Sequence, residues 1–188
     1  MGKTTAFLKF IAENKSRWKF VFDPELEIVR KWKVARHQTV DSMVAVLTNS
    51  VKTGKPCLIA FDPAQMFPGD FRGALDFFCK WCLEVCRPLH GEKLVCVDEI
   101  QKFTKTGVWG VPQGLTELLD TGRREEIDFA CVCNRGINEL NDDVRAQMTE
   151  AYCFRTTEPL ALRILEKMGF DPKKLPTLKK GQSIKLEL

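Results

Sequence analysis

The chain has 188 residues, of which 44% are hydrophobic and 29% charged, and its formal net charge is +4. This length fits one domain of roughly 100–200 residues, and the composition excludes a disordered chain, a collagen-like repeat and a small disulfide-bonded protein. No apolar run approaches the roughly 18–20 residues of a membrane span, and the N-terminus lacks a secretory signal. We therefore expect a protein of a reducing cytosol.

Short apolar runs alternate along the chain with segments of helical periodicity, which is the pattern of an α/β fold. Most of the runs are apolar at consecutive positions, as is typical of strands buried on both faces of a parallel sheet. The predicted strands are Trp18–Asp23, Cys57–Asp62, Leu94–Asp98, Phe129–Asn134 and Ala151–Arg155.

Apolar residues at helical spacing predict helices before and between these strands. The predicted helices begin, in chain order, near Lys3, Val40, Phe71, Leu115 and Thr157. After Gly169 the periodicity ends, and five lysines stand against Asp171 and Glu187. We therefore expect a folded domain over residues 1–168 and a basic, flexible tail over residues 169–188.

The first helix opens with Gly2-Lys3-Thr4-Thr5, which matches the second half of a phosphate-binding loop. Such a loop needs a glycine where backbone amides approach phosphate, a lysine to neutralise the outer phosphates and a hydroxyl to hold Mg²⁺. The positive end of the following helix also favours an anion. The match predicts that Gly2 to Thr5 bind a nucleotide and that Thr4 contacts the metal ion.

Two carboxylates, Asp98 and Glu99, follow directly on the apolar strand Leu94–Val97. In a nucleotide site the first would hold Mg²⁺ through water, and the second would polarise the attacking water. A strand that merely ends in solvated acids is the alternative. The loop upstream, in the order that a nucleotide site requires, favours the catalytic interpretation.

A third group of motifs lies further along, in Thr121–Asp128, the strand that ends at Asn134-Arg135, and Glu139–Gln147. With the two motifs above, this layout resembles the FtsK/HerA family of P-loop motor ATPases, which includes genome-packaging ATPases of tailless, membrane-containing viruses. The Zot-like assembly ATPases of filamentous phages have a similar layout. The resemblance covers residues 2–168 and implies a three-layer, RecA-like P-loop fold with a mostly parallel sheet.

The resemblance also implies roles for particular residues. Asn134 falls where the family has a polar sensor of the γ-phosphate. Arg123 or Arg124 would be a finger that reaches the nucleotide of a neighbouring subunit, because an arginine fork stays charged and stabilises a transferring phosphate. In the alternative interpretation the two arginines are a solvated basic pair, and the dipole of the helix that ends before them favours their positive charge.

The chain departs from the family pattern at its first residues. A complete loop has an earlier glycine, four further residues and a leading strand, whereas only Met1 precedes Gly2 here. We expect either a start that lies further upstream or a shortened relative. In a shortened relative, most of the amides that cradle phosphate would be missing, and tight ATP binding would be lost.

Two further features have both a chemical and a structural interpretation. Cys79, Cys82 and Cys86 have the spacing of metal ligands, but they fall on one helix among apolar residues, so we favour packing over metal. The loop 103–112 contains Trp109, and Lys102 and Lys105 beside it could face DNA phosphate. We favour the alternative, in which Trp109 fastens the loop to the body of the domain.

Together these observations predict an ATPase that uses Mg²⁺ and ATP to move double-stranded DNA, as the resemblance implies for viral genome packaging. It would act as a homo-oligomeric ring, because the arginine finger of one subunit must reach the nucleotide of the next. The ring would work in the host cytoplasm or at a virion vertex. The basic tail could contact DNA, a capsid portal or an anionic membrane surface. A Zot-like virion-assembly ATPase and an inactive P-loop binding module remain alternatives.

Overall fold

A computed structural model of the chain describes residues 2–104, 110–134 and 136–188. The contacts divide it into two compact units: unit 1 is Met1–Phe10, Glu99–Val111 and Val132–Leu188, and unit 2 is Ile11–Asp98 and Pro112–Cys131. The predicted roles of Lys105, Trp109 and Arg135 fall outside the described residues. The assignment of residues 1–168 to one ATPase domain remains a prediction. Among the described helices, none has the length and apolar character needed to cross a bilayer.

Unit 2 is built on a five-stranded sheet in which all neighbouring strands run parallel, in the order β2-β3-β1-β4-β5. The three central strands are buried at nearly every residue, which explains their continuous apolar sequences. This confirms the predicted α/β fold with a parallel sheet. The strands are β1 (Trp18–Phe22), β2 (Arg36–His37), β3 (Cys57–Phe61), β4 (Lys93–Val97) and β5 (Ile127–Cys131).

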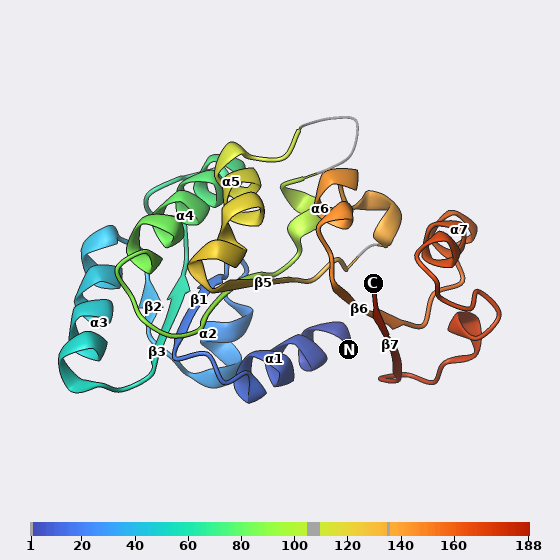
Figure 1. The fold of residues 1–188 in the computed structure, drawn as a ribbon, viewed down its shortest axis with the longest axis horizontal. Coiled ribbons are helices and arrows are strands. Elements are labelled where there is room, and N and C mark those ends of the chain that lie inside the picture. Colours follow the sequence, from blue (N-terminus) through green and yellow to red (C-terminus); the bar gives the residue numbers. More distant parts are fainter. Residues whose placement is uncertain (1, 105–109, 135) are drawn as a thin grey trace. The chain divides into compact units, whose positions relative to one another are not determined.

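Aromatic packing attaches helix α4 (Phe71–Cys86) to one face of this sheet. The ring of Phe78 lies 5.6 Å from that of Phe22 on β1 and stacks on Phe61 of β3 at 5.7 Å, measured between centroids. Helix α5 (Gln113–Thr121) lies beside α4, where the Gly114 amide donates to the Asp76 carboxylate at 2.6 Å (Figure 1). A Cβ on Gly114 would come within 2.3 Å of the Asp76 carbonyl oxygen, so only glycine permits this approach.

The opposite face is covered by the end of helix α1 (Lys3–Glu13) and by helix α2 (Glu27–Trp32). Helix α3 (Val40–Thr53) packs along β3 (Figure 1). Its first turn is fixed by a capping box, in which Thr39 and Ser42 each accept a hydrogen bond from the backbone of the other. Gly54, at φ 71°, ends this helix in the left-handed conformation that glycine adopts without strain.

Unit 1 contains the antiparallel pair β6 (Glu150–Phe154) and β7 (Ser183–Glu187), with helices α6 (Asp142–Ala146) and α7 (Pro159–Lys167). Single turns of 3₁₀ helix lie at η1 (Ile100–Lys102), η3 (Ile137–Glu139) and η4 (Leu175–Thr177). A small core fixes the C-terminal part of this unit. Its buried members are Ala151, Leu165, Phe170 and Leu175.

The structure differs from the sequence-based expectations at three places in unit 1. The segment expected to be a flexible tail is folded, because Phe170 and Leu175 are buried and β7 completes a strand pair. The strand predicted at residues 151–155 forms as β6, but it pairs with β7 and not with the parallel sheet. Helix α7 begins at Pro159, two residues after the predicted start near Thr157, and the Glu158 carboxylate caps it by accepting from two backbone amides.

Candidate functional site

The predicted phosphate-binding lysine lies at the first residue of α1, in unit 1. Lys3 Nζ donates to the carbonyl oxygens of Cys133 and Asn134, at 3.1 and 2.9 Å. Gly2 packs closely against β6, since a Cβ there would lie 3.3 Å from the Phe154 ring. The start of α1 is therefore held directly against the segment that carries the predicted sensor.

The predicted catalytic acid belongs to the same cluster. Glu99 Oε1 accepts a hydrogen bond from Asn134 Nδ2 at 2.9 Å, and Glu99 Oε2 forms an ion pair with Lys102 Nζ. Glu99 has φ 51°, a left-handed conformation that costs a non-glycine residue about 1 kcal/mol or more. Leu26, Lys33 and Glu126 have the same left-handed backbone conformation, so this strain is not particular to Glu99.

Sequence reasoning did not identify Gln101, which is buried at 2% exposure in η1. Its Oε1 accepts from the backbone amide of Asn134 at 3.3 Å, and the neighbouring Ile100 amide donates to the Val132 carbonyl at 3.0 Å. These bonds join the turn that carries Glu99 to the segment that carries Asn134. A polar residue two positions after Glu99 could have indicated such a contact, but the sequence does not show which way its side chain points.

The predicted metal-binding residues supply oxygen atoms. Asp98, in unit 2, follows the last residue of β4 and is buried at 5% exposure. Thr4 is half-buried and Thr5 is exposed, both in the first turn of α1 in unit 1. A carboxylate and a hydroxyl are the donor types that Mg²⁺ prefers, so the chemistry of Asp98 and Thr4 fits this ion.

Two other buried acids of unit 2 also end parallel strands, and both stabilise the local fold. Asp23 accepts from the backbone amides of Glu27, Ile28 and Val29 at 2.8–3.0 Å and so caps α2. Burial raises the pKa of Asp23, against these hydrogen bonds. Asp62 forms an ion pair with Arg36. These partners give Asp23 and Asp62 a structural role.

Arg123 and Arg124 lie in the 3₁₀ turn η2 (Gly122–Glu125) of unit 2, and both are exposed. This turn leads into the amino end of β5, whereas Asp98 follows the carboxyl end of β4. Because β4 and β5 are parallel and in register, the two positions are about one strand length apart, roughly 16 Å. The arginine pair therefore does not reach Asp98 of its own chain, and its role as a finger remains a prediction.

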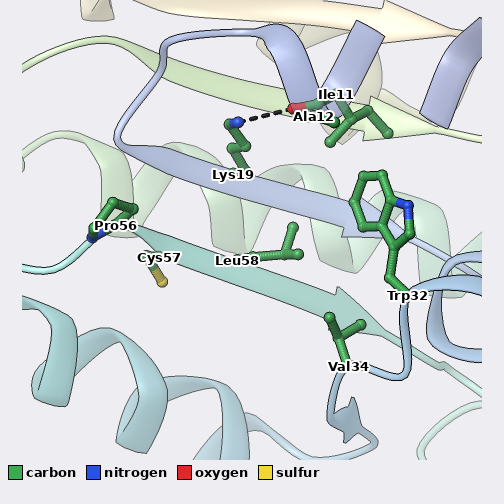
Figure 2. Close-up of a pocket in the computed structure, with 8 residues that line it drawn as sticks. All are labelled: Ile11, Ala12, Lys19, Trp32, Val34, Pro56, Cys57 and Leu58. Atoms are coloured by element: carbon green, nitrogen blue, oxygen red, sulfur yellow. Dashed lines mark hydrogen bonds between the residues drawn. The ribbon is translucent and has the colours of Figure 1, made fainter. Parts of the chain in front are cut away.

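An apolar pocket of about 360 Å³ lies in unit 2, and the predicted site residues are not among those that line it. Its lining comes from β1, β3, the end of α1 and the segment that follows α2, and Figure 2 shows the Lys19 amine directed toward the Ile11 carbonyl. Lys19 Nζ donates to the carbonyls of Ile11 and Asn14, both at 2.7 Å, and burial lowers the pKa of this amine. Lys19 thus caps the C-terminal end of α1, and this contact gives the residue a structural role.

The cysteines of α4 are core residues. Cys79, Cys82 and Cys86 are fully buried, and burial raises the pKa of each thiol, that of Cys86 to about 12. The part of the chain that the structure describes contains no cluster of three or more His, Cys, Asp or Glu side chains able to hold a metal ion. The complete burial of the three side chains supports the packing interpretation.

Thiol labelling should follow this burial. At pH 8 the partly exposed Cys131 and Cys133 should react first with a disulfide reagent, because the five buried thiols are inaccessible. Cys153 is also partly exposed, but burial raises its pKa, so it should react more slowly than these two. In denaturant all eight cysteines should react. Fast labelling of Cys79, Cys82 or Cys86 in the native protein, identified by mass spectrometry, would contradict this assignment.

The structure thus has an α/β fold with an all-parallel five-stranded sheet, and the sequence Gly-Lys-Thr-Thr opens α1. No protein-family model matches the sequence, and no curated protein does either. Solved structures do match. The genome packaging NTPase B204 of Sulfolobus turreted icosahedral virus 2, in complex with ATP-gammaS, has a TM-score of 0.69 at 19% identity, over 99% of this chain and 86% of that one.

Two further structures are similar. The DNA-packaging ATPase B204 of Sulfolobus turreted icosahedral virus has a TM-score of 0.50 at 16% identity, over 93% of this chain and 94% of that one. The N-terminal domain of zonular occludens toxin from Neisseria meningitidis has a TM-score of 0.47 at 15% identity, over 100% and 87% of the two chains. The first of these, with the ATP-gammaS complex, confirms the predicted likeness to packaging ATPases at the level of the fold. The toxin domain is too distant to carry an argument.

Proposed function

We propose that this chain is an ATPase that drives double-stranded DNA into a viral capsid. The observation that carries the proposal is the hydrogen-bonded cluster in unit 1, where Lys3, Glu99 and Asn134 meet although 131 residues separate Lys3 from Asn134. Sequence motifs select Lys3 as phosphate binder and Glu99 as catalytic acid, and the family resemblance adds Asn134 as sensor. The fold, shared with a genome packaging NTPase, supports the same conclusion.

Binding of the nucleotide would begin at the first turn of α1. The unpaired amides of a helix N-terminus and the Lys3 ammonium both attract phosphate. Lys3 now donates to two backbone carbonyls, and it would exchange these for phosphate oxygens when ATP arrives. That exchange would remove a hydrogen bond from the Asn134 carbonyl, so phosphate binding would directly change the contacts of the sensor residue.

Hydrolysis would depend on Glu99 and Asn134. Glu99 would orient the attacking water and accept its proton as the bond from the γ-phosphorus to the bridging oxygen breaks. The Asn134 amide, which already contacts Glu99 at 2.9 Å, would detect the loss of the γ-phosphate and move with it. Thr4 and Asp98 would hold Mg²⁺, which offsets the charge of the transferring phosphates.

Movement of DNA would require a ring of such chains. The exposure of Arg123 and Arg124, and their separation from Asp98 of the same chain, favour a role at the nucleotide of a neighbouring subunit. Contacts of this head-to-tail kind close only in a ring. Double-stranded DNA would occupy the centre of the ring. A capsid portal or membrane-vertex protein would bind the motor at the virion.

Stimulation of ATP turnover by DNA tests the translocase proposal. Phosphate release should be measured with and without linear double-stranded DNA, on this chain and on a form that carries the residues encoded upstream of Met1. The proposal expects a faster rate with DNA. A rate of ATP turnover that DNA does not change would favour a virion-assembly ATPase. Nucleotide binding without turnover would favour an inactive binding module.

Replacement of Lys3 by methionine should weaken binding of ATP-gammaS by about 10- to 100-fold, since a charged hydrogen bond contributes about 1.5–3 kcal/mol. Methionine keeps the length of the side chain, so the loss reports the ammonium. Isothermal titration calorimetry measures the effect. Lys9→Met on the same helix is the matched control, and an equal loss in both variants would refute a specific role for Lys3.

A further inference from the structure

A turn near the C-terminus of unit 1, which we call the lysine turn (residues 179–182), lies against the start of α1. The Gln182 amide donates to the Lys179 carbonyl at 3.0 Å, and the Lys179 amide donates to Gln182 Oε1 at 2.9 Å. A Cβ on Gly2 would lie 3.4 Å from the Gly181 Cα. The lysine turn therefore contacts the residue that directly precedes α1.

This contact brings positive charge to a place that is already positive. Lys179 and Lys180 are both exposed, and the described ion pairs of this C-terminal segment involve Lys174 and Lys185 instead. The N-terminus of a helix carries the equivalent of about half a positive charge, and Lys3 adds a full charge at the first residue of α1. Such a concentration of like charge is unfavourable until an anion binds there.

The cluster around Lys3 also contains a buried hydrogen-bond donor without an acceptor. Gln101 is 2% exposed, and its Oε1 accepts from the Asn134 amide at 3.3 Å. Its Nε2 has no acceptor within the part of the chain that the structure describes. Asn134 links this side chain to Lys3, because the Asn134 carbonyl accepts from Lys3 Nζ at 2.9 Å. Unpaired buried donors are uncommon, and this one is a second, independent indication that the cluster accommodates a ligand with acceptor oxygens.

We propose that the lysine turn is a second wall of the phosphate site, where Lys179 and Lys180 bind the outer phosphates of a nucleotide together with Lys3. A polyphosphate fits these features because it carries several negative charges and many acceptor oxygens. Each lysine is a point charge on a flexible four-carbon stem, which suits contacts with phosphates bound at the first turn of α1. The inference rests on the proposed nucleotide-binding function and names residues that the sequence motifs do not include.

Isothermal titration calorimetry with inorganic tripolyphosphate and with ATP-gammaS tests this inference on the double variant Lys179→Met/Lys180→Met. Both ligands should bind about 5- to 20-fold more weakly than to the wild type, as expected for the loss of two exposed charge pairs. The loss should decrease from ATP-gammaS to ADP to AMP, because the lysines contact phosphate and not the base. Lys179→Arg/Lys180→Arg keeps both charges and should retain the wild-type affinity.

The matched control is Lys173→Met/Lys174→Met, which removes two charges from exposed positions of the same unit. Its affinity for both ligands should fall by less than about twofold, because distant exposed charges are screened by salt. An equal loss in the two methionine double variants would overturn the inference. An unchanged affinity in Lys179→Met/Lys180→Met would do the same.

Thermal unfolding distinguishes phosphate binding from a purely structural role of the lysine turn. Without ligand, Lys179→Met/Lys180→Met should melt at or slightly above the wild-type temperature, because the substitutions remove repulsion at the start of α1. ATP-gammaS should then raise its melting temperature less than it raises that of the wild type. A lower melting temperature without ligand, together with a wild-type shift on adding ATP-gammaS, would show a structural role and overturn the inference.

The inference and the proposed function fail in different ways. Tripolyphosphate binding that depends on the two lysines, without any ATP turnover by the wild type, would remove the ATPase and keep the phosphate site. Normal ATP-gammaS binding and turnover in Lys179→Met/Lys180→Met would keep the ATPase and remove the role of the lysine turn. Weaker binding of a 30-base-pair duplex with unchanged ATP-gammaS affinity would assign the lysines to DNA and also overturn the inference. A wild type that binds neither tripolyphosphate nor ATP-gammaS would overturn both.

Discussion

Replacement of Glu99 by glutamine is expected to lower ATP turnover by about two to four orders of magnitude, the usual contribution of a positioned general base. Glutamine keeps the shape of the side chain and can still accept the hydrogen bond from Asn134, so the cluster with Lys3 should remain. It cannot accept a proton from water at neutral pH. Steady-state phosphate release measures the rate, and calorimetry with ATP-gammaS should show retained binding.

The matched control for this substitution is Glu92→Gln, at an exposed acid that lies before β4. It should leave both turnover and binding near the wild-type values. If Glu99→Gln retained most of the wild-type rate, the catalytic role of Glu99 would be wrong. Equal loss of binding and turnover would instead indicate that the substitution disturbs the structure of the site.

Replacement of Phe78 by alanine is expected to destabilise the protein by about 3–5 kcal/mol. This ring is fully buried between α4 and the sheet and contacts both Phe22 and Phe61. Its removal leaves a cavity that these rigid neighbours do not fill. Denaturant unfolding followed by circular dichroism measures the change in the free energy of unfolding.

Phe71→Ala provides the comparison on the same helix, because Phe71 is 37% exposed at the first residue of α4. Its cost should be below about 1 kcal/mol, as is common for surface positions. Similar costs for the two substitutions would contradict the packing of α4 against the sheet. This pair of variants therefore tests the fold independently of any activity.

The central strands of unit 2 could be predicted because their sequences obey a simple physical rule. Strands buried on both faces are largely apolar, and β1, β3 and β4 are so except at Lys19 and Lys93. The short β2 has two residues and gave no such signal. The missed strand β7 does alternate polar and apolar residues over Ser183–Glu187, but the surrounding lysines and prolines suggested a flexible tail.

The candidate site was predictable in its residue types and less so in its contacts. Local motifs identify Lys3, at the start of a helix, and Glu99, after the end of a strand, whereas Asn134 was identified only through the family resemblance. The bonds that join them depend on the folded chain, as does the placement of Gln101 beneath Asn134. The partner of Arg123 or Arg124 belongs to another subunit in the proposed motor, so one chain does not test it.

The most direct test of the central claim is phosphate release from ATP, with and without Mg²⁺, by this chain and by the form extended upstream of Met1. We predict release that requires Mg²⁺ in at least the extended form, and that Glu99→Gln lowers it by at least about 100-fold. Release that persists without Mg²⁺ or in Glu99→Gln would contradict the assigned site. No release from either form would contradict the ATPase itself.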